Sequence, residues 1–133
     1  MKKFCEICNQ EFETIQYGHQ RKYCFDCVPQ TDSLAERTAW KRQAAKREAV
    51  KRLGGKCAKC GESRQHILDF HHIDPRERDE TPSRLLANSK IQDFFFEIEK
   101  CILLCSNCHQ DFHWLSVYDK ELTIELYLDS NIE

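Results

Sequence analysis

Two cysteines and two histidines lie within nine positions of one stretch, "ILLCSNCHQDFH" at residues 102–113. Cys105 and Cys108 have the spacing at which a tight turn delivers two thiolates to one zinc ion. His109 and His113 are four positions apart and would share one face of a helix. A single tetrahedral zinc cannot easily use four ligands this close together, so the stretch serves either one metal or two.

Cysteine spacing points to structural zinc. Eight of the nine cysteines form four Cys-x-x-Cys pairs, a repetition that is typical of zinc sites and that disulfide frameworks do not require. We expect two closed zinc sites, one from the first two pairs and one from the last two. The first comprises Cys5, Cys8, Cys24 and Cys27, and the second comprises Cys57, Cys60, Cys105 and Cys108. The ninth, Cys101, is expected to be a small buried hydrophobic residue.

The histidines left over point to a further metal. His71 and His72 are neighbours at the end of a predicted strand in "HILDFHHI", so their side chains should point to opposite sides. His71 can then join His109 and His113 as a third ligand, while His72 faces whatever the metal binds. Three histidines and a free position are typical of a catalytic metal site. The alternative is one irregular structural zinc with solvated histidines.

A zinc protease is not expected, because Gln110 stands where the His-Glu-x-x-His motif needs its general base.

The elements that position these groups begin with a small zinc module, predicted over residues 1–30. Its segment from 4 to 27 is too short to fold on a hydrophobic core alone, and zinc binding can supply the missing folding energy. We expect aromatic side chains to pack beside the metal. These are Phe4, Phe12, Tyr17, Tyr23 and Phe25. Such a module either stabilises the fold or contacts a partner.

A basic helix is predicted over residues 33–53, within a connecting segment at 31–54. Ser33 and Glu36 form a capping box, and Gly54 with Gly55 ends the helix. A helix this polar either bridges two modules through solvent or lies along an anionic partner, which favours nucleic acid. Its seven candidate phosphate-binding residues are Arg37, Lys41, Arg42, Lys46, Arg47, Lys51 and Arg52.

The third unit is predicted over residues 55–118, with an acidic C-terminal tail at 119–133. The expected order is a strand, a loop, a helix over 89–100 capped by Ser89 and Gln92, the short strand "CILL", and a helix from about Asn107. For the tail from about Leu122, the pattern leaves both a strand and a helix open. Residues 1–54 carry 11 basic and 7 acidic side chains, whereas residues 55–133 carry 9 and 15.

Within residues 55–115, "LDFHHI" and "KCILLCSNCHQDFH", framed by "CAKC", resemble the HNH nucleases of the ββα-metal fold. The resemblance implies a small α+β protein, in which a ββα-metal domain follows the zinc ribbon and the basic helix. It implies that His71, His109 and His113 bind a catalytic metal and that His72 is the general base. The family's middle Asn, which holds the base, should fall near Lys100 or Cys101, and neither is Asn.

The resemblance also implies the activity: a metal-dependent endonuclease that hydrolyses DNA phosphodiester bonds, by nicking or by double-strand cleavage. The expected cofactors are two structural Zn²⁺ and one catalytic divalent ion, which can be Mg²⁺, Mn²⁺, Ni²⁺ or Zn²⁺. The alternative is a catalytically inactive HNH-like zinc protein that binds DNA or a partner protein.

Double-stranded DNA is the expected partner. No membrane is expected, because no apolar run approaches the roughly 20 residues that a membrane span needs. The start "MKKFCEIC" lacks the apolar core of an export signal, which favours the cytoplasm of a bacterial or phage-infected host cell.

Overall fold

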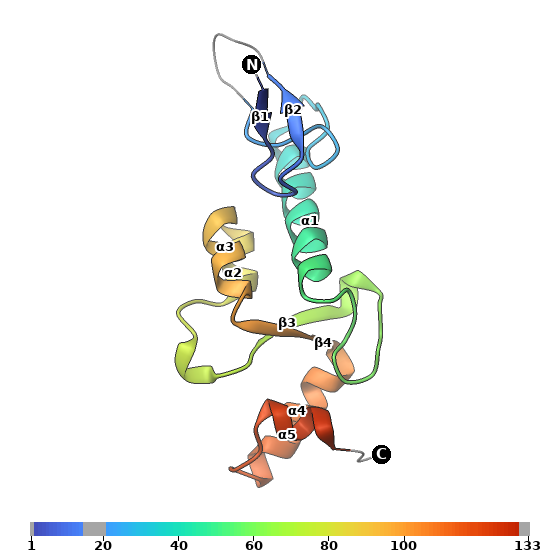
Figure 1. Cartoon of the computed structure of the whole chain (residues 1–133), viewed down its shortest axis with the longest axis vertical. Helices are drawn as coiled ribbons and strands as arrows, with labels where there is room; N and C mark the ends of the chain where they lie inside the picture. The colour runs from blue at the N-terminus through green and yellow to red at the C-terminus, as the bar shows by residue number, and fades with distance from the viewer. Residues whose placement is uncertain (1, 15–20, 131–133) are drawn as a thin grey trace.

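The computed structural model describes residues 2–14 and 21–130, which form an elongated molecule (Figure 1). Strands β1 (Lys2–Phe4) and β2 (Glu11–Glu13) pair antiparallel in the N-terminal module. Helix α1 (Leu34–Arg52) runs from this module to a second two-stranded sheet, and helices α4 (Ser106–Tyr118) and α5 (Ile124–Asp129) lie at the far end. Among the described residues, no helix combines the length and the apolar character that a bilayer span requires.

The predicted ends of α1 are confirmed. The Ser33 hydroxyl accepts a hydrogen bond from the backbone N–H of Glu36 at 3.3 Å. The Glu36 carboxylate accepts from the Thr31 hydroxyl instead of completing the capping box. Gly54 and Gly55 then leave the helix with φ angles of 106° and 80°, a backbone region that glycine adopts without steric cost.

The second sheet pairs β3 (Leu68–His72) antiparallel with β4 (Cys101–Cys105), so that His72 lies opposite Cys101. Between them the chain forms α2 (Pro82–Ala87) and α3 (Ile91–Ile98). A short 3-10 helix at Gln65–Ile67 precedes β3, and another at Pro75–Glu77 follows it. After β4 come α4 (Ser106–Tyr118) and α5 (Ile124–Asp129), which settles the tail segment as a helix.

Two details of this unit differ from the prediction. Helix α2 was not predicted, because its six residues are too few to show a helical period. Helix α3 begins at Ile91 with no side-chain cap, and Ser89 instead has a positive φ of 58°. The turn between α2 and α3 therefore uses the Ser89 backbone, and the predicted Ser-x-x-Gln cap is wrong.

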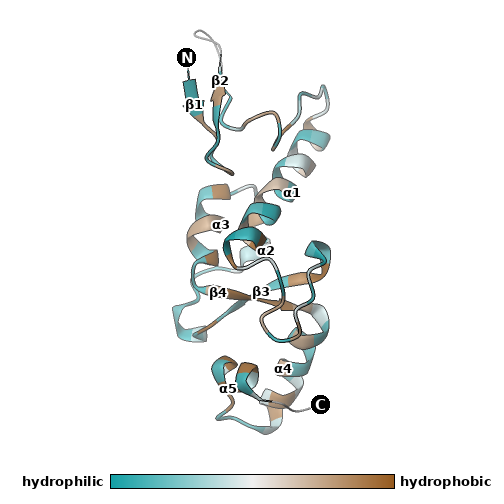
Figure 2. Cartoon of the chain, turned by 45° about the vertical axis from the view of Figure 1, so that its right-hand side comes forward, coloured by the Kyte–Doolittle hydropathy of each residue, from teal (hydrophilic) through white to brown (hydrophobic). Residues whose placement is uncertain are grey.

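Helix α1 is packed rather than solvated on all sides. Its small residues Ala44, Ala45 and Ala49 are buried in one cluster with the N-terminal zinc module and with α3. Val50, one residue further along, joins a second cluster that contains β3, β4 and α5. The apolar colouring of α3, β3 and β4 in Figure 2 follows this core. The hypothesis that α1 bridges two modules through solvent alone is therefore wrong.

The predicted aromatic core of the N-terminal module is confirmed only in part. Phe12 and Tyr23 are partly buried and pack against the cluster that contains the cysteines, whereas Phe4 and Phe25 are exposed, at 63% and 50%. Tyr17 lies outside the described residues. The space beside the cysteines is filled by Ile7, Val28 and the alanines of α1 instead. Small helix residues allow the module to approach the α1 backbone closely, which large aromatic rings would prevent.

Candidate metal centres and the histidine hollow

The first four-cysteine cluster has zinc-site dimensions. The ligand atoms of Cys5, Cys8, Cys24 and Cys27 all lie within 4.8 Å of one another. The Sγ atoms of Cys8 and Cys24 are 3.6 Å apart. A disulfide would need about 2.05 Å, whereas Zn–S bonds of about 2.3 Å place tetrahedral sulfurs roughly 3.8 Å apart. The geometry therefore fits a metal site and not a disulfide.

The second cluster repeats these dimensions across a much longer separation in sequence. Its four ligand atoms, from Cys57, Cys60, Cys105 and Cys108, also lie within 4.8 Å, with 3.6 Å between the Sγ atoms of Cys60 and Cys105. The backbone N–H of Ala58, between the first two cysteines, donates to the Leu103 carbonyl of β4 at 2.8 Å, and Cys105 is both the last residue of β4 and the N-cap of α4. The predicted pairing of the four Cys-x-x-Cys motifs is thus confirmed as two clusters compatible with zinc.

The first Cys-x-x-Cys pair of each cluster lies in the same kind of turn. After Cys5, the N–H of Asn9 donates to the Cys5 carbonyl at 2.9 Å, and Asn9 has a φ of 63°. After Cys57, the N–H of Gly61 donates to the Cys57 carbonyl at 3.0 Å, with a φ of 82°. Gly and Asn are the residues that visit this left-handed region most easily. In both pairs, the turn that points the two thiols towards one metal therefore favours Asn or Gly directly after the second cysteine.

The backbone of these turns favours thiolates. Burial opposes ionisation of Cys57, but backbone N–H groups, led by that of Cys60, lower the pKa of its thiol to about 7. Burial likewise opposes ionisation of Cys5, and backbone hydrogen bonds again leave its pKa below the ordinary value. Burial and the neighbouring thiols raise the pKa of Cys27 and Cys108. Zinc would remove this conflict within each cluster, because it binds all four sulfurs as thiolates.

The three histidines predicted as metal ligands come together. His71 at the end of β3 meets His109 and His113 of α4, and one nitrogen from each lies within 4.8 Å of the others. The Nε2 atoms of His109 and His113 are 2.9 Å apart. Among the described residues, the buried Nδ1 of His71 has no hydrogen-bond partner. Three converging imidazole rings, one of which has a buried nitrogen without a partner, fit a divalent metal ion.

Asp69 is a candidate site residue that the sequence did not reveal. Its Oδ2 atom lies 3.1 Å from Nδ1 of His109, so that Nδ1 donates to the carboxylate and the Nε2 lone pair is left facing His113. Carboxylates fix metal-binding histidines in this way. The available signal was its position in "LDFHH", two residues before His71 and hence on the same face of the strand.

The electrostatics of the triad favour the neutral, ligating form. Burial, together with His109 and His113, lowers the pKa of His71 to about 4. Burial and His109 also lower the pKa of His113. Both shifts favour the unprotonated imidazole, which is the form that binds a metal.

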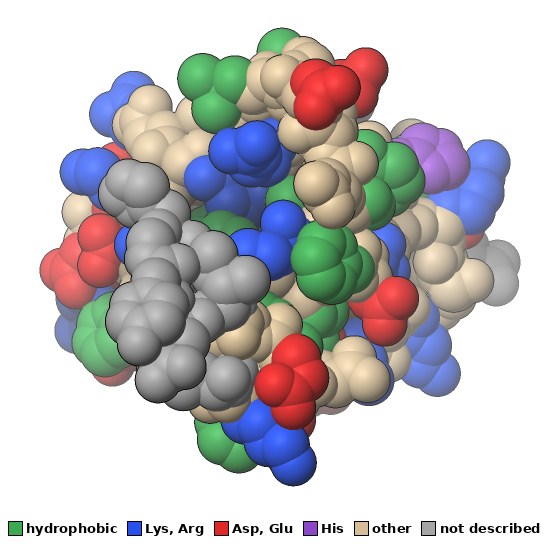
Figure 3. Space-filling view, turned by 90° about the horizontal axis from the view of Figure 1, so that it is seen from above, with side chains coloured by type: hydrophobic (Ala, Val, Ile, Leu, Met, Phe, Trp, Pro, Cys, Tyr) green, Lys and Arg blue, Asp and Glu red, His purple; other side chains and the backbone are tan. Residues whose placement is uncertain are grey.

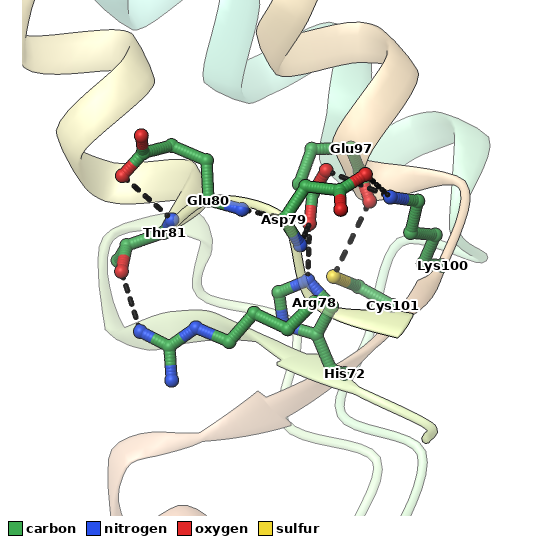
Figure 4. Close-up of polar contacts among 8 residues, drawn as sticks. All are labelled: His72, Arg78, Asp79, Glu80, Thr81, Glu97, Lys100 and Cys101. Atoms are coloured by element: carbon green, nitrogen blue, oxygen red, sulfur yellow. Dashed lines mark hydrogen bonds and ion pairs between the residues drawn. The ribbon is translucent and has the colours of Figure 1, made fainter. Parts of the chain in front are cut away.

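His72 points the other way, as the strand alternation predicts, and meets a buried partner. Its Nε2 lies 2.7 Å from Oε1 of Glu97 on α3 (Figure 4), and the two side chains are 8% and 3% exposed. His72 still borders a hollow of about 450 Å³ that all three triad histidines also line. Sequence reasoning missed Glu97, although a lone acid among Phe94, Phe95 and Ile98 was a visible anomaly.

The predicted phosphate-binding residues of α1 do not share one surface. Arg42 and Lys46 line a smaller hollow of about 230 Å³ that shares Asp69, Phe70 and Ser83 with the histidine hollow. Arg37 lies instead in a hollow of about 690 Å³ in the N-terminal module, together with Arg21. Figure 3 shows this end of the molecule, with several Lys and Arg side chains on its surface. The fold therefore brings the middle of α1, not its start, towards the histidines.

The other basic residues of α1 also differ in what they contact. Arg52 donates to the Ile7 carbonyl at 3.2 Å and lies over the Phe95 ring. Lys41 lies over the ring of Tyr23. Among the described residues, the side chains of Arg47 and Lys51 have neither a hydrogen-bond nor an ion-pair partner, and both are exposed. The charges that remain available to an anionic partner are thus fewer than seven.

Comparisons of the chain with protein-family models, with curated proteins and with solved structures give no match. The class is therefore defined by the fold and its clusters. The chain is a small mixed α/β protein with two two-stranded antiparallel sheets and two four-cysteine clusters compatible with zinc.

Proposed function

We propose that this protein is a metal-dependent endonuclease of the HNH type, which hydrolyses phosphodiester bonds in DNA by nicking or by double-strand cleavage. In this proposal β3, β4 and α4 form the ββα-metal unit. The observation that carries the proposal is one hollow lined by His71, His109 and His113 together with His72. Ligands for a divalent ion and a candidate base thus border the same space.

The roles follow from the chemistry of these side chains. His71, His109 and His113 would hold the divalent ion, which when bound supplies Lewis-acid stabilisation of the charge that develops on the phosphate. His72 accepts a proton from the attacking water as the new P–O bond forms. The P–O bond to the 3′-oxygen then breaks, and this oxygen takes a proton from solvent water, which gives 5′-phosphate and 3′-hydroxyl ends.

Substrate binding is assigned to the basic residues around the site. Because residues 55–133 carry 15 acidic and only 9 basic side chains, the nuclease unit has little attraction for DNA by itself. Arg42 and Lys46 border the neighbouring hollow, and Arg78 lines the histidine hollow. We propose that these groups lead the phosphate backbone to the histidines.

Cleavage of supercoiled plasmid, with Mg²⁺, Mn²⁺, Ni²⁺ or Zn²⁺ added in turn, tests the proposal. His72→Ala should lose about 10²–10⁴-fold in rate, the usual contribution of a general base, and should keep its zinc and its DNA affinity. His66→Ala, which removes an exposed histidine nearby in sequence, should cut at the wild-type rate.

Two outcomes separate the alternatives. Equal rates for His72→Ala and wild type would refute the assigned base. Binding of DNA by a wild-type protein that cuts with none of the four metals would favour the inactive DNA-binding module.

A further inference from the structure

The carboxylate of Glu97 is buried and fully engaged. Its residue is 2% exposed, on the apolar face of α3. Oε1 accepts from the backbone N–H groups of Asp79 and Glu80 at 3.0 and 3.3 Å, and Oε2 lies 3.1 Å from Nζ of Lys100. Figure 4 shows these donors converging with His72 on the one side chain. A buried acid with this many donors is held in one orientation.

Those donors also decide the ionisation state of the carboxylate. Burial alone would raise the pKa of Glu97, but hydrogen bonds from His72, Lys100 and the backbone outweigh it and lower the pKa to about 2. An ionised carboxylate only accepts hydrogen bonds. The 2.7 Å contact therefore requires that Nε2 of His72 carries the proton.

We propose that Glu97 is the positioning residue for His72: it holds the imidazole with Nε2–H on the carboxylate and leaves Nδ1 to act as the base. This inference rests on the proposed nuclease function for its catalytic meaning. When water loses a proton, Nδ1 gains it, Nε2 keeps its own, and the imidazolium that forms faces the Glu97 carboxylate. Glu97 stays ionised throughout and neither gains nor loses a proton.

The same carboxylate fixes the segment that follows the base. Asp79 and Glu80 belong to the connection between β3 and α2, and the neighbouring Arg78 and Thr81 line the histidine hollow. A second tie is the ion pair between Lys100 and Asp79 at 2.7 Å. Glu97 thus holds both the base and one wall of the hollow, the role for which the HNH resemblance implies an Asn near Lys100.

A double-mutant cycle tests the assignment. Glu97→Gln keeps an acceptor oxygen and the shape of the side chain but removes the charge. We expect a loss of about 10–100-fold in kcat with KM for DNA within about twofold. In a His72→Ala background the same change should cost nothing further, because Gln still offers an oxygen to the backbone N–H groups of Asp79 and Glu80, and the lost charge acts on the reaction through His72. Glu99→Gln, at an exposed position on the same segment, should match wild type.

A second measurement does not depend on cleavage. An imidazole N–H bonded to a buried carboxylate gives a downfield, slowly exchanging proton resonance. We expect this resonance in wild type, its absence in His72→Ala, and an upfield shift in Glu97→Gln. If wild type does not cut DNA, this resonance still shows whether His72 and Glu97 form the hydrogen bond. Failure of the nuclease proposal is therefore distinguishable from failure of the positioning role.

Three results would overturn the positioning role. One is an equal loss from Glu97→Gln with and without His72, which would mark a purely structural residue. Another is an unaltered kcat in Glu97→Gln. The last is a downfield resonance that is missing in wild type or unmoved in Glu97→Gln. Zinc content and thermal unfolding of each variant establish that the fold persists in the samples compared.

Discussion

Replacing Asp69 tests whether the histidine triad is built to hold a metal. Among the described residues, Asp69 is the one carboxylate hydrogen-bonded to a triad member, with 3.1 Å between Oδ2 and Nδ1 of His109. Asp69→Asn keeps an acceptor oxygen but removes the charge that makes His109 a stronger ligand. Asp69→Ala removes the acceptor as well and frees the ring to turn.

The exposure of the Asp69 side chain sets how much metal affinity its replacement should cost. Loss of an outer carboxylate costs about 10–100-fold in metal affinity, which is about 1.4–2.7 kcal/mol. The Asp69 side chain is 42% exposed, so solvent screens part of its charge. We therefore expect Asp69→Asn near the lower limit, about 10-fold, and Asp69→Ala towards the upper limit.

Calorimetric titration measures this directly. Protein already loaded with zinc at both cysteine clusters is titrated with Mn²⁺ or Ni²⁺, and the affinity of the additional site is compared between variants. Asp93→Asn, at an exposed position on α3, serves as the matched control and should bind as wild type does. Unchanged affinity in both Asp69 variants would refute the role of this carboxylate in metal binding, and an absence of any additional site in wild type would refute the metal triad.

Elemental analysis should find at least two zinc ions per chain. The variant Cys8→Ser should lose one of them, and its melting temperature should fall because zinc contributes folding energy to the N-terminal module. One zinc per chain in wild type, or disulfides among the eight cysteines, would contradict the two-cluster structure. The double variant Arg42→Gln/Lys46→Gln, at the two α1 residues that border the hollow beside the histidines, should weaken DNA binding about equally for all sequences and flatten the slope of log K against log salt by about two units, one for each phosphate that is no longer neutralised. A control, Lys120→Gln, should leave the slope as in wild type, and an unchanged slope in the double variant would exclude this face of α1 from the DNA interface.

The candidate metal-binding residues were predictable because their spacing in the sequence fixes the relative positions of their side chains. A Cys-x-x-Cys pair supplies two corners of a tetrahedron wherever it occurs, and an i, i+4 histidine pair shares a helix face in any context. Strand alternation was equally informative, since it places His71 and His72 on opposite faces whatever the strand packs against. These rules depend on local sequence alone, and the rest of the fold determines only which pairs lie next to each other.

What escaped prediction depends on tertiary packing. The alanines of α1 gave a weak apolar signal, yet they are buried because small side chains let the zinc module and α3 approach the helix. Helix α5 could not be told from a strand, although Tyr127 anchors it to α4 through a 2.9 Å hydrogen bond to Asp111. Neither segment alone indicates the surface that covers it.

The position of Glu97 has a simple origin in the alternation of β3. Leu68, Phe70 and His72 share one strand face, and on the α3 side Phe70 meets Phe94 edge to face with 5.4 Å between ring centroids. A histidine on this strand face points into the core, and a buried imidazole nitrogen needs a hydrogen-bond partner there. Helix α3 supplies one by replacing a single apolar residue of its buried face with Glu97. The acid that looks out of place in the α3 pattern is therefore the counterpart of the histidine that looks out of place in β3, and the two anomalies explain each other.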